Sequence, residues 1–78
     1  MNHYLVQVSK EAFVFGSSRT VREQDVKASL TKAGLVKSWD DAEIRIFSDD
    51  QFPSVKASVA ALRDNNSQVK VLNYDPLS

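Results

Sequence analysis

The sequence predicts a small α/β fold, with α+β as the alternative, in which a mostly parallel four-stranded sheet carries two helices. Three observations support this prediction. Four short segments are alternating or β-rich, two longer segments place apolar residues at helical spacing, and together they follow the order ββαβαβ. Two successive strand–helix–strand units favour parallel pairing through right-handed crossovers. A chain of 78 residues has room for one domain, so we expect residues 1–78 to fold as a single unit.

An N-terminal pair of strands is expected at residues 3–8 and 12–15. From Tyr4 on, every second side chain of the first strand is apolar, which is typical of a strand with one buried face. The second segment is short and rich in β-forming residues. Residues 9–11 can turn a hairpin between them, although they lack the Asn-Gly or Asp-Gly pair that tight hairpins favour. One bulged strand through residues 3–15 is the alternative.

The first helix has the clearest signals. Its start is predicted at Thr20, because Thr20 and Glu23 have the spacing of a capping box, in which the two side chains each accept from a free backbone amide. Gly34 predicts its end, since glycine readily adopts the left-handed conformation that terminates helices. Its core face is expected to consist of Val26, Leu30 and Ala33.

Two further strands are predicted in the second half of the chain. The segment 42–47 alternates, with Ile44 and Ile46 expected to point inward. The last strand is expected at residues 68–74. Residues 75–78 are expected to form a frayed C-terminal tail.

The second helix is predicted between these strands, at residues 51–63. Asp49 or Asp50 can cap its start, and Pro53 lies in its first turn, where a missing amide is harmless. Its buried stripe is expected to consist of four apolar residues, Phe52, Val55, Val59 and Leu62.

Composition narrows the classes of function. Ten basic and ten acidic residues give no net charge, but residues 1–38 hold six bases and three acids, and residues 39–78 hold four bases and seven acids. This asymmetry favours a charged partner or head-to-tail self-association. The absence of cysteine excludes a disulfide framework, a thiolate site and a cysteine-type zinc cluster. Since no long apolar run is present, we predict a cytoplasmic protein with no membrane partner.

A loop before the first helix has the ingredients of an anion site. Gly16, Ser17, Ser18 and Arg19 offer close backbone approach, two hydroxyls and a guanidinium beside the free amides of a helix start. The loop lacks the lysine and the spacing of a P-loop. It nevertheless supports an alternative function, in which the protein handles a phosphate or a nucleotide.

Three carboxylates could complete that site. Asp49, Asp50 and Asp75 follow the third and fourth predicted strands. Because the carboxyl ends of parallel strands lie at the same edge of a sheet, we expect these acids to face the loop of residues 16–20. Carboxylate oxygens are the ligands that magnesium prefers, so a metal site is predicted there as part of this alternative. No other cofactor is predicted.

Catalytic and nucleic-acid-binding patterns are weak. His3 is the only histidine and lies at the start of the chain, so a Ser–His–Asp arrangement has no firmly held base, and no catalytic residue is predicted. Arg22, Lys27 and Lys32 point around the first helix instead of along one face. The chain also lacks the net positive charge that phosphate backbones attract. Nucleic-acid binding is therefore a second alternative.

An apolar stripe on the first helix supports the preferred hypothesis. Val21, Ala28 and Leu35 are seven residues apart and lie nearly opposite the core face. A helix on a small sheet needs one apolar side, so a second is typical of contact with another chain. Trp39 lies in the polar connection that follows and is of a residue type that anchors interfaces. We predict a non-enzymatic protein-binding module of the accessory or inhibitor type, which self-associates or docks on a larger protein.

Overall fold

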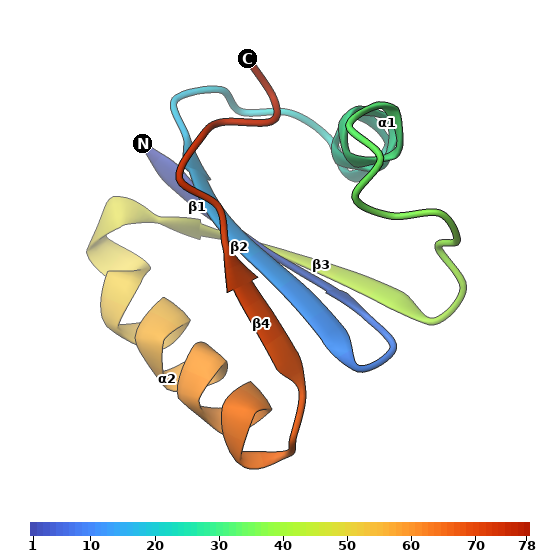
Figure 1. Cartoon of the computed structure of the whole chain (residues 1–78). Coiled ribbons are helices and arrows are strands. Elements are labelled where there is room, and N and C mark those ends of the chain that lie inside the picture. The colour runs from blue at the N-terminus through green and yellow to red at the C-terminus, as the bar shows by residue number, and fades with distance from the viewer.

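A computed structural model describes residues 1–78 and contains four strands and two helices in the predicted order (Figure 1). Neither helix has the length and apolar character that a membrane span requires. The elements are β1 (Asn2–Val8), β2 (Glu11–Ser17), α1 (Glu23–Lys32), β3 (Ala42–Ser48), the 3-10 turn η1 (Asp49–Gln51), α2 (Phe52–Asp64) and β4 (Gln68–Val71).

The sheet is mixed, so the prediction of a mostly parallel sheet is wrong. Its strand order is β3-β1-β2-β4; β1 is antiparallel to both β2 and β3, and only β2 and β4 pair in parallel. The hairpin between β1 and β2, whose loop residue Ser9 takes a φ of 55° as the first residue of a primed hairpin turn must, gives one antiparallel pair. The second antiparallel pair forms because β3 pairs with β1 instead of β2. The chain after β2 then passes over β1 and pairs with its far side. The hairpin also rules out one bulged strand.

Three strands nevertheless run in the same direction. Since β2 and β3 are both antiparallel to β1, and β4 is parallel to β2, the carboxyl ends of β2, β3 and β4 lie at one end of the sheet. The chain moves from β2 to β3 past α1 and returns to β4 past α2 on the opposite face (Figure 1). Because both the direction and the face reverse, the two crossovers have the same hand.

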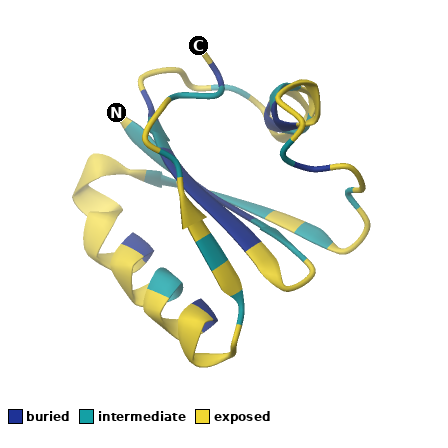
Figure 2. Ribbon diagram, in the orientation of Figure 1, coloured by how far each residue is buried: buried dark blue, intermediate teal, exposed yellow.

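A hydrophobic core lies on each face of the sheet, and the buried residues of each helix face it (Figure 2). The two central strands contribute to both cores because their successive side chains point to opposite faces. The core under α1 consists of Tyr4, Val6, Phe13, Phe15, Val26, Leu30, Val36 and Leu77. The core under α2 consists of Leu5, Ala12, Val14, Val55 and Leu62.

The end of α1 is as predicted, but its start is not. Gly34 has a φ of 77°, and the Leu35 amide donates to the Leu30 carbonyl over 3.0 Å, which together form a Schellman-type stop. The helix begins at Glu23, three residues after the expected cap Thr20. Thr20 does not cap the helix, because its hydroxyl accepts a hydrogen bond from the side-chain amide of Asn2 over 2.9 Å. Ala33 was expected on the core face of the helix but is exposed, since it is the C-cap residue at the end of α1.

Neither aspartate caps α2 as predicted: the N-cap residue of α2 is Gln51, without a side-chain hydrogen bond, and Ser48 is the N-cap of the preceding turn η1. The Ser48 amide donates to the Gln51 side-chain oxygen over 3.0 Å, while Asp49 and Asp50 lie within η1 itself. Pro53 occupies the first turn of α2, as expected.

Two apolar residues that were predicted to point inward are partly exposed. Ile46 is 41% exposed because β3 is an edge strand, and Phe52 is 40% exposed because the start of α2 extends beyond the core. Val55 and Leu62 are buried as expected. The position of each residue in the fold, which local sequence does not determine, therefore decides how deeply these side chains are buried.

The C-terminal segment at residues 75–78, which was expected to form a frayed tail, is docked against the fold. β4 ends at Val71, earlier than the predicted residue 74. The chain then turns over the α1 side, where Leu77 is only 5% exposed and belongs to the core. The Leu77 amide donates to the Asp75 carboxylate over 2.9 Å, which fixes this turn locally.

Candidate functional site

The loop that was predicted to bind an anion is engaged by the C-terminal segment. Ser17 is 1% exposed, and its hydroxyl donates to the Asp75 carboxylate over 2.7 Å while accepting from the Arg19 amide over 3.1 Å. The Arg19 guanidinium donates to the Leu77 carbonyl over 2.8 Å. The loop thus binds a carboxylate of its own chain, and an external anion would have to compete with it.

The remaining loop residues offer little more to a ligand. Ser18 is exposed, and none of its side-chain atoms bonds another residue of the chain. Gly16 lies against Met1, and a Cβ atom added at Gly16 would come within 2.9 Å of the Met1 sulfur. The glycine therefore makes room for the start of β1, where the sequence predicted room for an anion.

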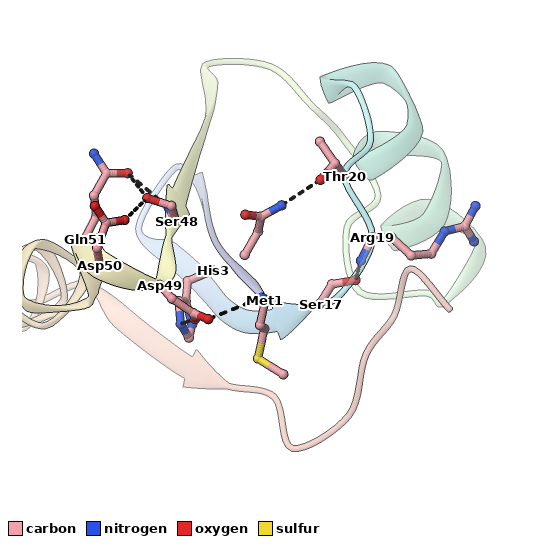
Figure 3. Close-up of polar contacts among 10 residues, drawn as sticks. Met1, His3, Ser17, Arg19, Thr20, Ser48, Asp49, Asp50 and Gln51 are labelled. Atoms are coloured by element: carbon pink, nitrogen blue, oxygen red, sulfur yellow. Dashed lines mark hydrogen bonds and ion pairs between the residues drawn. The ribbon is translucent and has the colours of Figure 1, made fainter.

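The three acids of the predicted metal site turn to different partners. Asp49 lies 3.3 Å from the Met1 amino group and 3.1 Å from Nε2 of His3, whereas Asp50 bonds the Ser48 hydroxyl (Figure 3). Asp75 bonds Ser17. No group of three or more His, Cys, Asp or Glu side chains is placed to hold a metal ion. The magnesium hypothesis therefore gains no support from the geometry.

The Asp49 contact makes stability depend on pH. Hydrogen bonding to the Met1 amino group, with a further contribution from His3, lowers the pKa of the Asp49 carboxyl below its ordinary value of 3.8. A carboxyl with a lower pKa in the folded state stabilises the fold above its unfolded-state pKa, and this contribution is lost as the pH falls through the folded-state value. We expect the difference in unfolding free energy between wild type and Asp49→Asn to shrink below a pH of about 4.

Urea unfolding of the untagged protein at a series of pH values measures this difference. Acetylation of the Met1 amino group removes the main partner charge and serves as the matched control, because it should reduce the difference at neutral pH as well. A difference that stays constant into strong acid would contradict the contact.

The predicted partner surface on α1 is mostly used within the fold. Val21, Leu35 and Trp39 are partly buried and pack against the core under α1, which leaves Ala28 as the one exposed member. The Trp39 indole donates to the Thr31 hydroxyl over 2.9 Å. Val21 and Leu35 lie outside the helix itself, in the segments that flank α1, so the helical wheel does not describe their positions. Docking through α1 stays a prediction, but little apolar surface is free for it.

A more open apolar surface lies between α2 and β4. There the two elements border a groove of about 320 Å³, in which Phe52 and Val71 are 40% and 58% exposed. Two basic side chains and no acidic ones border it. The lining residues are Val14, Phe52, Val55, Lys56, Val59, Ala60, Arg63 and Val71.

The groove runs beside an open strand edge. β4 is an edge strand of the sheet. The Gln68 amide donates to the carbonyl of Lys10, just before β2, over 2.7 Å, and the Leu72 amide donates to the Val14 carbonyl of β2 over 2.8 Å. Because backbone groups alternate sides along a strand, Val69 and Val71 point their N–H and C=O groups away from β2. These groups have no strand partner within the chain.

The opposite edge of the sheet is less accessible to a partner. β3 carries Glu43 and Arg45, which lie 3.7 Å apart as an ion pair on its α2-facing side, and charged side chains of this kind protect an edge. None of the three cavities of the molecule is lined by a β3 residue. The apolar groove and the open edge therefore coincide only at β4.

A larger cavity of about 600 Å³ lies on the other face of β4, toward the β1–β2 turn. Lys10, Lys37 and Lys70 line it with Glu11 as the one acid, and none of the three lysines forms an ion pair. The Lys70 ammonium lies 5.6 Å from the centre of the Phe13 ring. Basic side chains thus lie on both faces of β4, beside a mainly apolar groove on one face and around the larger cavity on the other.

The sequence shows a pattern for the α2 side of the groove, and the sequence-based prediction did not include it. Phe52, Lys56, Ala60 and Arg63 are three or four residues apart and form a second side of α2. That β4 lies at an edge next to this side of α2 follows only from the strand order.

The fold and the groove together define a small mixed-sheet α+β protein with an open edge strand. Scans against family models, curated proteins and solved structures found no match to this chain.

Proposed function

We propose that the protein is a small non-enzymatic protein-binding module, which accepts an extended segment of another protein on the β4 edge. The observation that carries the proposal is the open edge at Val69 and Val71 beside the apolar groove against α2. In strand addition, main-chain hydrogen bonds supply affinity and side-chain pockets supply specificity. Both parts are present at β4.

Charge favours a different protein over a second copy as the occupant. If two copies paired through β4 about a two-fold axis, Lys70 and the groove residues Lys56 and Arg63 of both copies would share one short interface. Like charges at adjacent strand positions are destabilising, and edge lysines are a common protection against self-pairing. A partner segment without basic residues avoids this repulsion.

Replacing Val71 with proline tests the proposal. Proline removes the outward N–H and places its ring where an added strand would lie, while the hydrogen bonds that the Gln68 and Leu72 amides donate remain. We expect peptides selected from a displayed random octapeptide library to bind wild type and to shift the β4 and α2 amide resonances. Val71→Pro should weaken this binding by about tenfold or more.

Val71→Ile is the matched control, because isoleucine keeps the amide, the preference for strand conformation and the apolar character of this groove position. It should bind the same peptides nearly as well as wild type. Resonance shifts confined to α1 and Trp39 would overturn the β4 surface in favour of the α1 surface. A dimer in sedimentation experiments that Val71→Pro abolishes would make a second copy the occupant instead.

A further inference from the structure

We infer that the segment bound on β4 alternates apolar and acidic residues. This inference rests on the proposed function and specifies the chemistry of the partner. It follows from the different character of the two faces beside the β4 edge, one an apolar groove and the other a cavity lined by lysines.

Strand geometry imposes the alternation. Successive side chains of an added strand point to opposite faces of the sheet, as they do in β4 itself. On the α2 face they meet the groove, where Phe52, Val59 and Val71 present apolar surface that water now contacts. Apolar side chains at every second position of the partner would cover this surface and gain from its burial.

On the α1 face the intervening side chains meet positive charge. Lys70 projects from β4 on this side, over the Phe13 ring, and lines the same cavity as Lys10 and Lys37. All three lysines are exposed and lack an acidic partner within salt-bridge distance, so their charges are available. A carboxylate of the partner that lies next to Lys70 would meet this positive charge, which Glu11 offsets only in part. Complementary charge would also speed the association of the partner.

The rim of the groove supports the same preference. Lys56 and Arg63 are seven residues apart on α2, and both line the groove. Their positive charge favours acidic residues before or after the apolar positions and opposes basic ones. The Lys56 ammonium already lies 5.2 Å from the centre of the Phe52 ring, at the start of the groove. No acidic side chain of the chain lines the groove to compensate these charges.

Three synthetic octapeptides with capped ends test the inference. The first alternates valine and glutamate, the second has the same composition in two blocks, and the third alternates valine and lysine. Fluorescence anisotropy measures their affinity for wild type, Lys70→Glu and the control Lys32→Glu, in which an exposed lysine of α1 outside all three cavities is reversed. Val71→Pro is included to report whether binding uses the β4 edge.

We expect the alternating acidic peptide to bind wild type at least about tenfold more tightly than either of the others. Lys70→Glu should lower this affinity by about tenfold and shift preference toward the lysine peptide, whereas Lys32→Glu should leave both unchanged. Equal binding of all three peptides that Val71→Pro still weakens would overturn the alternation but keep the proposed function. Binding that neither Lys70→Glu nor Val71→Pro affects, or no binding, would overturn both.

Discussion

Replacing Phe13 with alanine is expected to lower the free energy of unfolding by about 3–5 kcal/mol. The Phe13 ring is 1% exposed and belongs to the core under α1, so its removal loses the burial of an aromatic ring and leaves a cavity. Small domains have total stabilities of about 5–15 kcal/mol, and a chain of this size lies toward the lower limit. Urea unfolding followed by far-ultraviolet circular dichroism would measure the change.

Phe52→Ala is the matched control, because it removes the same side chain from a site that is 40% exposed. We expect it to cost about 1 kcal/mol and to leave the fold intact, since the loss is one of partial burial. Under the proposed function it should nevertheless weaken peptide binding in the groove. Equal destabilisation by the two variants would contradict the assignment of Phe13 to the core and Phe52 to the surface.

Replacing Leu77 with alanine is expected to destabilise the protein by about 2–5 kcal/mol, a large effect for the penultimate residue of a chain. Leu77 is 5% exposed, and two hydrogen bonds, from Arg19 to the Leu77 carbonyl and from Ser17 to the Asp75 carboxylate, hold the segment against the fold. The loss of this side chain should also release Ser17 from Asp75. Faster hydrogen exchange at the Arg19 amide, which donates to Ser17, would report that release.

The control for Leu77 is Asn73→Ala, which changes an exposed residue of the same segment. It should alter the unfolding free energy by less than about 0.5 kcal/mol. If Leu77→Ala had an equally small effect, the segment would not be docked in solution, and the loop at residues 16–19 would be free to bind an external anion.

Features that depend on neighbouring residues could be predicted from the sequence. Gly34 ends α1 because a left-handed conformation is needed there, and Pro53 fits a helix start because its missing amide has no partner in the first turn. Alternation located β1 and β3 to within one residue. In each case the physical cause acts over four or fewer residues, which is the range that a sequence pattern reports directly.

Features that depend on which strands pair could not be predicted in the same way. Two strand–helix–strand units are compatible with several strand orders, and the hairpin at Ser9 makes β1 and β2 neighbours without determining which of them pairs with β3. Strand order in turn determines the exposure of Ile46, the location of the β4 edge and the groove beside α2. Local sequence patterns therefore could not predict the groove beside β4.

The meeting of three strand ends at one end of the sheet was predicted correctly from the sequence. The loop after β2 and the acids after β3 and β4 do lie at the same end of the sheet, because those three strands share a direction. What the sequence could not show is that Asp75 binds Ser17 while Asp49 binds Met1 and His3. Side chains at one edge of a sheet can satisfy each other in pairs and leave no donors for a ligand.

The brevity of β4 has a consequence for how long a bound segment would stay. A strand of four residues presents two outward-facing residues, and each backbone hydrogen bond contributes about 0.5–1.5 kcal/mol net. A partner that slipped along the edge by two positions would lose about half of these bonds. Binding of this kind dissociates quickly and tolerates little misalignment, which suits a contact that must be made and broken repeatedly.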